Sequence, residues 1–138
     1  MKPKVTKARI SEAIEAPFNA QSLSKELVTR YFNGTEEDKT EQKIALEKTL
    51  EVLSSASNPQ AQKALTELQS SNINAAKKSL ITLASSQKNL QESSQTWINI
   101  GNVQNLSSSR QALQAYQKAS EIDPENITAY LRQGHVYR

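Results

Sequence analysis

Apolar residues recur at helical spacing along most of the chain. Ile10 and Ile14 stand four residues apart, which predicts a first helix from about residue 6 to residue 16. The same spacing predicts a second helix before the Asn-Gly pair at 33–34, a sequence at which helices commonly end. Two serines are candidates for its N-cap, Ser22 or Ser24.

A third, longer helix is predicted from Thr35 to the break at 54–59. Its first turn holds three acidic residues at 36–38, where the helix dipole favours anions. Four apolar residues form a stripe that is either the seam of a dimeric coiled coil or a surface packed inside the chain: Ile44, Leu46, Leu50 and Leu53. Because fewer than three clean heptads are present, packing inside the chain is favoured.

After Pro59 the pattern changes to short helices joined by short polar turns. Apolar residues from Ala61 to Leu68 and from Ile73 to Leu83 form two stripes on either side of a turn at 70–72, which predicts an αα-hairpin. Neither helix is long enough to be stable alone, so each requires packing against its neighbour. A polar bridge is expected over 85–94.

The remaining chain repeats one pattern at a constant offset. The first copy consists of Trp97-x2-Ile100-Gly101, then Ala112-x3-Tyr116-x2-Ala119, then Pro124. The second copy is Tyr130-x2-Gln133-Gly134-x2-Tyr137, whose aromatic and glycine positions lie 33 residues after those of the first copy. A fixed period of this length is typical of helical repeat proteins.

These residues resemble the tetratricopeptide repeat (TPR), a helix-turn-helix unit of about 34 residues, and the sequence looks like a bacterial member of that family. The resemblance implies that Trp97 fills the space between helices A and B of one repeat, and that Gly101 lets helix B approach closely. The remaining positions have implied roles as well: Ala112 opposite the glycine, Tyr116 and Ala119 toward the next repeat, and Pro124 at the end of helix B.

The predicted fold is all-α, with antiparallel helix-turn-helix repeats stacked as an α-α superhelix. Four parts are expected: an N-terminal helical segment at 1–58, a degenerate TPR-like hairpin at 59–94, a TPR repeat at 95–126, and helix A of a further, truncated repeat at 127–138. Composition agrees with helices, because 3 Gly and 4 Pro among 138 residues leave few of the turns that a β-sandwich or barrel needs.

The same composition excludes several kinds of chemistry. The chain has no Cys, which rules out disulfides and thiolate metal sites, and 1 His, which argues against a His-based metal centre or a Ser-His-Asp triad. The three glycines are too far apart for a phosphate-binding loop. We therefore predict a protein that is not an enzyme and that uses no cofactor or metal.

Charge and hydropathy constrain the partners. The formal net charge is +3, in blocks that alternate in sign, and the aromatics are not interleaved with Lys and Arg, which argues against nucleic acid. No apolar stretch reaches the ~20 residues of a membrane span. The expected partner is a protein or peptide, and the expected location is cytoplasmic.

The resemblance also implies where a partner binds. Stacked repeats form a concave face, lined by helix A residues, that holds an extended peptide or a partner helix. The polar candidates on this face are Gln95, Asn99, Asn102, Asn105, Arg132 and His135, with Ile98, Thr128 and Leu131 beside them. Asn side chains can both donate to and accept from a peptide backbone, and Arg can pair with a carboxylate. The other interpretation is that this face is solvated or covered by further repeats.

The predicted function is a protein–protein interaction scaffold. One alternative is self-association through exposed apolar surfaces, which would make a homo-oligomer. Another is that the chain is the regulatory fragment of a larger bacterial signalling protein or enzyme.

Overall fold

A computed structural model describes residues 18–137, which form seven α-helices and no strand. The helices are α2 (Ala20–Tyr31), α3 (Glu36–Ser55), α4 (Pro59–Gln69), α5 (Ile73–Ser86), α6 (Leu90–Gln104), α7 (Ser109–Ile122) and α8 (Ile127–Tyr137). The all-α prediction is thereby confirmed for the described residues. The helix predicted over 6–16 lies outside them.

Polar side chains cap the starts of α2 to α7, each accepting a hydrogen bond from a backbone N–H in the first turn. The caps are Asn19, Thr35, Asn58, Asn72, Asn89 and Ser108. Thr35 is the predicted cap of α3. The prediction of a Ser22 or Ser24 cap for α2 is wrong, because Asn19 Oδ1 accepts from the Ser22 N–H at 2.9 Å and the helix begins earlier. Asn is as effective a cap as Ser.

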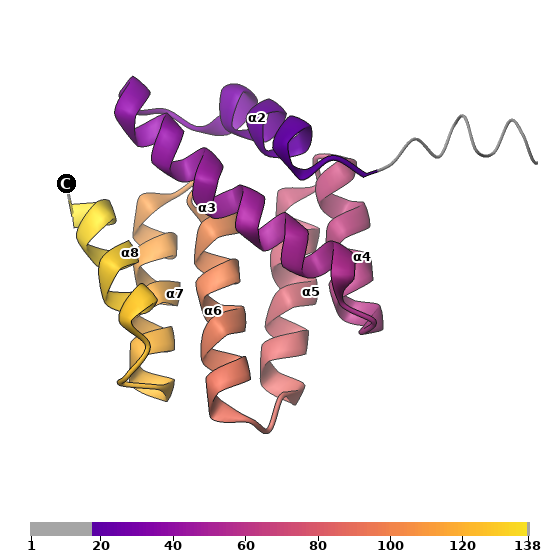
Figure 1. Ribbon diagram of the computed structural model, residues 1–138, viewed down its shortest axis with the longest axis vertical. Helices are drawn as coiled ribbons and strands as arrows, with labels where there is room; N and C mark the ends of the chain where they lie inside the picture. The colour runs from indigo at the N-terminus through magenta and orange to yellow at the C-terminus, as the bar shows by residue number, and fades with distance from the viewer. Residues whose placement is uncertain (1–17, 138) are drawn as a thin grey trace, which may run out of the picture.

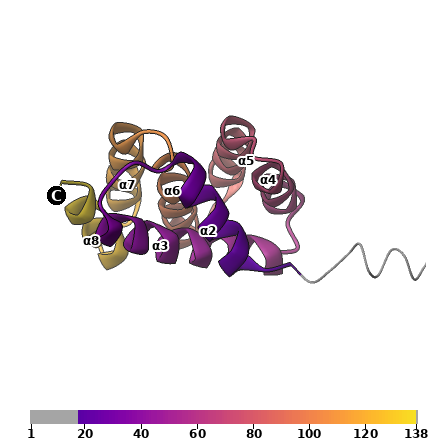
Figure 2. The ribbon, with the colours of Figure 1, turned by 90° about the horizontal axis from the view of Figure 1, so that it is seen from above.

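The helices α4 to α8 form a layer in which each packs against the next one along the chain (Figure 1). α3 lies across one face of this layer, and α2 lies beside α3 over one end of it, where Arg30 of α2 donates to Ser71 in the α4–α5 turn (Figure 1, Figure 2). α3 runs obliquely across the layer and packs against α4 and α6, while α2 packs against α3. The N-terminal helices therefore share a hydrophobic core with the hairpins that follow them.

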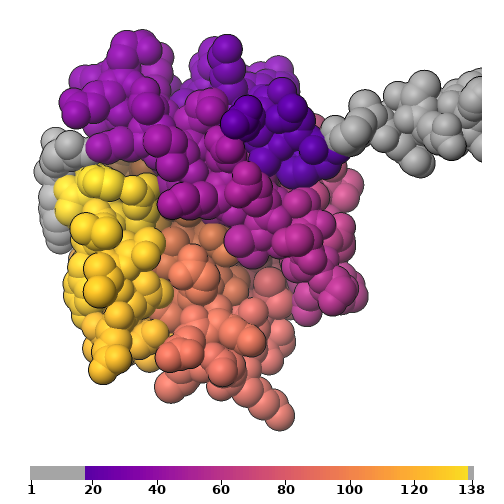
Figure 3. All heavy atoms as spheres, viewed as in Figure 1, coloured from indigo at the N-terminus to yellow at the C-terminus, as the bar shows by residue number. Residues whose placement is uncertain are grey.

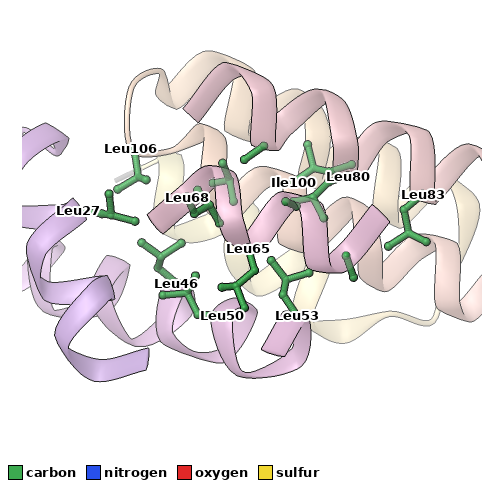
Figure 4. Close-up of a cluster of buried hydrophobic side chains, with 14 of the residues drawn as sticks. Leu27, Leu46, Leu50, Leu53, Leu65, Leu68, Leu80, Leu83, Ile100 and Leu106 are labelled. Carbon is green, nitrogen blue, oxygen red and sulfur yellow. The ribbon is translucent and has the colours of Figure 1, made fainter. Parts of the chain in front are cut away.

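Leucines from α3 fill the space between the covering helices and the layer (Figure 4). Leu46 and Leu50 are completely buried, and Leu53 is 1% exposed. They share one apolar cluster with Leu68 of α4 and Ile100 of α6. The predicted packing inside the chain is confirmed for these three leucines, which do not form the seam of a coiled coil. It is wrong for Ile44, which is 50% exposed.

A smaller apolar cluster joins α6, α7 and α8, and consists of Ile98, Ala112, Tyr116, Ala119 and Ala129. Trp97 is half-buried and packs against both clusters. Lys118 Nζ lies 5.7 Å from the centroid of its ring, within the range of a cation–π contact. Pro124 follows the end of α7, and its carbonyl accepts from the Tyr130 hydroxyl at 3.0 Å.

The polar bridge expected over 85–94 is much shorter, because α5 continues to Ser86 and α6 begins at Leu90. Ser93 and Ser94 are buried within α6. Their hydroxyls donate to the carbonyls of Ala84 and Ala119, at 3.1 and 2.7 Å. Serines that suggest a loop by composition thus bond α6 to the helices on both sides of it.

Gly101 marks the close approach of α6 and α7. A Cβ at this position would overlap the ring of Tyr116. These nearest atoms belong to the aromatic residue one turn after Ala112 in α7, and the place of Ala112 opposite the glycine stays a prediction. Gly134 stands at the same position 33 residues later, and a Cβ there would meet no atom within 4 Å.

The two glycines make a matched pair for a test of this packing. We expect Gly101→Ala to lower the free energy of unfolding by about 1–3 kcal/mol, because Tyr116 must move out of its place. Gly134→Ala should be neutral or raise it by up to about 1 kcal/mol, because Ala favours the helix and nothing opposes the added methyl group. Urea denaturation of the three proteins measures both effects. Equal losses in the two variants would contradict the proposed role of Gly101.

Candidate protein-binding groove

Three asparagines that the repeat pattern predicts on the concave face, two in α6 and one at its C-cap, lie against α3. Asn99 and Asn102 are 6% and 4% exposed, and Asn105 is half-buried. They share one side of α6 because residues three apart are neighbours on a helix surface. α3 covers this side, where the sequence alone predicts a bound peptide or partner helix.

Thr49 of α3 links two of these asparagines. Its Oγ1 donates to Asn99 Oδ1 at 2.9 Å and accepts from Asn102 Nδ2 at 2.9 Å. Asn102 Nδ2 also lies 3.3 Å from the Ala45 carbonyl oxygen. Thr49 is completely buried. These bonds therefore satisfy polar groups that water does not reach.

Gln42 makes equivalent contacts two turns earlier in α3. Its Nε2 donates to the Asn102 carbonyl at 2.8 Å, and its Oε1 accepts from Asn105 Nδ2 at 2.8 Å. Gln42 is 2% exposed. Together these side chains form a row of hydrogen bonds between α3 and α6 that we term the polar seam: Gln42, Thr49, Asn99, Asn102 and Asn105.

Tyr116 extends the polar seam into α7. Its hydroxyl donates to Asn102 Oδ1 at 2.6 Å. Burial raises the pKa of Tyr116 well above its usual value, and the nearby positive charge of Arg132 partly opposes this shift. The phenol, already protonated at neutral pH, therefore stays a hydrogen-bond donor to a higher pH than an ordinary tyrosine does.

Removing α3 from this face would be costly. Fully burying a leucine is worth about 1.5–3 kcal/mol, so Leu46, Leu50 and Leu53 together contribute about 5–9 kcal/mol. A peptide that binds with micromolar affinity supplies about 8 kcal/mol. An incoming peptide would therefore gain little or nothing by replacing α3. We expect partners to bind beside α3 and not beneath it.

The two candidates on α8 lie together at the N-terminal end of α3. Arg132 Nη2 lies 2.6 Å from His135 Nδ1. Because a guanidinium can only donate, Nδ1 is the acceptor, which places the proton of a neutral imidazole on Nε2. His135 Nε2 faces Glu41 of α3, 4.0 Å from its Oε2. This group therefore ties α8 to α3.

A groove remains between α3 and α8, with α6 as its floor (Figure 3). Its volume is about 210 Å³. We term it the α3–α8 groove, and its lining comprises Ile44, Ala45, Lys48 and Val52 of α3, Gln95, Ile98, Asn99 and Asn102 of α6, and Thr128, Leu131 and Arg132 of α8. A wider hollow of about 600 Å³ continues from it toward the α5–α6 turn, and the two share Val52 and Asn99.

Three large apolar side chains stand exposed around the α3–α8 groove. Ile44 is 50% exposed, Val52 is 49% exposed and Leu131 is 57% exposed. Gln95, also a predicted site residue, is exposed on the α6 side. The sequence predicts Leu131 on this face, but it places Ile44 in the packed stripe of α3 and does not single out Val52. The signal for these two α3 residues was their spacing of eight residues, which puts them on one side of α3, away from the buried leucines.

Two features are absent from the described part of the chain. Within residues 18–137, no cluster of three or more His, Cys, Asp or Glu side chains has the arrangement to hold a metal ion. No helix in that range combines the length and apolar character needed to cross a membrane.

The polar seam makes Asn102 important for stability. We expect Asn102→Ala to lower the free energy of unfolding by about 2–4 kcal/mol, because it leaves the buried Tyr116 hydroxyl without its acceptor and removes one of the two partners of the Thr49 hydroxyl. Gln95→Ala, on the exposed side of the same helix, should change it by less than about 0.5 kcal/mol. Urea denaturation distinguishes the two. Similar small effects would show that the seam contributes little.

The raised pKa of Tyr116 predicts a pH dependence. The unfolded chain releases the phenol proton near pH 10, whereas the folded protein retains it to higher pH. The stability that this group contributes is therefore fully present below pH 10 and is lost as pH rises above it. We expect the difference in unfolding free energy between the natural protein and Tyr116→Phe to shrink from pH 9 to pH 11, about one unit on either side of the usual tyrosine pKa. The comparison isolates Tyr116, because the other groups titrate equally in both proteins. A difference that stays constant across this range, in urea denaturation, would contradict the assignment.

Comparison with known proteins adds no relative. No family model matches the chain, no curated protein matches it, and no solved structure matches it. The resemblance to the tetratricopeptide repeat therefore rests on the residues of this chain alone.

Proposed function

We propose that this chain is a non-enzymatic protein-interaction scaffold of the TPR-like helical-repeat type. Its α3–α8 groove binds a peptide or a partner helix. The observation that carries the proposal is the gathering of Ile44, Val52 and Leu131, all about half exposed, around one groove. Exposed apolar groups brought together from different helices are typical of protein-binding surfaces.

The size of the groove favours a partner's side chains over a small molecule. Pockets for drug-sized ligands have volumes of about 300–1,000 Å³, and the α3–α8 groove has about 210 Å³. Its walls come from helices far apart in the sequence, so a partner lying along it contacts α3, α6 and α8 together. Polar groups at Gln95 and Thr128 are available to the partner's backbone at the edges.

Selection from a displayed random peptide library tests this proposal. We expect selection on the natural protein to enrich a set of peptides. Their affinity should fall at least about tenfold for Leu131→Glu, which places a charge in the groove. The matched control is Leu90→Glu, which alters a leucine that is 64% exposed and lies outside the groove. This variant should bind the same peptides normally.

Two results would overturn the proposal. One is that no peptide is enriched. The other is that the enriched peptides bind Leu131→Glu as well as they bind the natural protein. Circular dichroism of both variants checks that the helices are retained.

A further inference from the structure

The charges around the α3–α8 groove are of one sign. Lys48 and Arg132 line it, and no Asp or Glu does so. Resting on the function proposed above, we infer that its partner is an acidic protein segment whose apolar side chains enter the groove and whose carboxylates pair with these two cations. This inference adds the chemistry of the partner to the location of its site.

Each wall of the groove places a cation directly beside apolar groups. On α3, Lys48 stands midway between Ile44 and Val52, four residues from each, which is about 6 Å along the helix axis in either direction. On α8, Arg132 follows Leu131. A partner that buries apolar side chains against Ile44, Val52 or Leu131 therefore brings its flanking positions within reach of a positive charge.

Both cations are able to bind a carboxylate. Lys48 is exposed and forms no ion pair with another described residue. Arg132 uses one guanidinium nitrogen for His135 Nδ1, and its planar group has further N–H donors for a carboxylate. A carboxylate at either place replaces water as the partner of the cation without breaking a described contact.

Acidic residues lie near these cations but do not line the α3–α8 groove. Glu47 is paired with Lys43 at 3.5 Å, and Glu51 is exposed on α3 three residues after Lys48. Asp38 and Glu41 line a separate hollow on the far side of Arg132. In the wider hollow beyond Val52, Lys88 and Glu92 offset each other. The α3–α8 groove is therefore the positive part of this surface, and opposite charge on a partner is favoured there.

Three labelled peptides of equal length test the inference by fluorescence anisotropy. The first combines leucines at helical spacing with glutamates, the second has the same leucines with glutamines, and the third has the same glutamates with alanines replacing the leucines. We expect the first to bind at least about tenfold more tightly than either of the others, with a preference over the second that falls as salt rises.

Two charge reversals locate the effect. Lys48→Glu should weaken binding of the first peptide about tenfold and leave the second unchanged. Lys78→Glu makes the same change in net charge at an exposed position on α5 outside the groove. The affinities of this variant for the first and second peptides should stay within about twofold of those of the natural protein. Arg132→Gln, which keeps hydrogen-bonding capacity without the charge, should weaken the first peptide in the same direction as Lys48→Glu.

The outcomes separate the two proposals. If the first and second peptides bind equally, and Leu131→Glu weakens both, the groove binds protein segments but the acidic preference is wrong. If the third peptide binds as well as the first, or Lys78→Glu is as harmful as Lys48→Glu, the surface attracts any polyanion and the inference is overturned. If neither leucine peptide binds, both proposals fail.

Discussion

The contact between α3 and α6 decides which surfaces this protein presents. On one side of α3 the leucines are buried in the core, and next to them the polar seam joins Thr49 and Gln42 to three asparagines of α6. The leucines provide most of the favourable free energy, because apolar burial is worth more than a hydrogen bond exchanged with water. The seam restricts where α3 can lie, because any other position leaves several buried polar groups unsatisfied.

Much of the local structure could be predicted from the sequence, because its determinants are local. The start of α3 follows from Thr35 and the acidic turn after it, and the α4–α5 hairpin follows from two apolar stripes around a polar turn. The sequence-based predictions are wrong where the composition of a segment suggests one structure and its packing favours another. Ser93 and Ser94 look like loop residues, yet both are buried in α6, because a hydroxyl that bonds a neighbouring helix's carbonyl is compatible with burial.

The site could be predicted only in part, because it depends on a contact between distant parts of the chain. The asparagines share one side of α6, but nothing local to them shows that α3 covers it. A signal was present in α3 itself. Gln42, Leu46, Thr49 and Leu53 follow a spacing of four, three and four residues, which is a packing stripe interrupted by two polar residues. Polar residues in such a stripe require polar partners on the facing helix, and the asparagine row of α6 supplies them.

The polar seam also connects stability to the proposed function. Successive residues of an α-helix point about 100° apart, so a shift of α3 by one residue would turn Ile44, Lys48 and Val52 away from the groove. A stripe made only of leucines tolerates a shift by one or two whole turns, because one leucine then takes the place of another, yet such a shift moves the groove residues along the helix axis. Gln42 and Thr49 are not interchangeable with leucine, because each has its own partner on α6. Buried polar residues are known to fix the register of packed helices in this way. The hydrogen bonds on the inner side of α3 therefore hold in place the residues that its outer side offers to a partner.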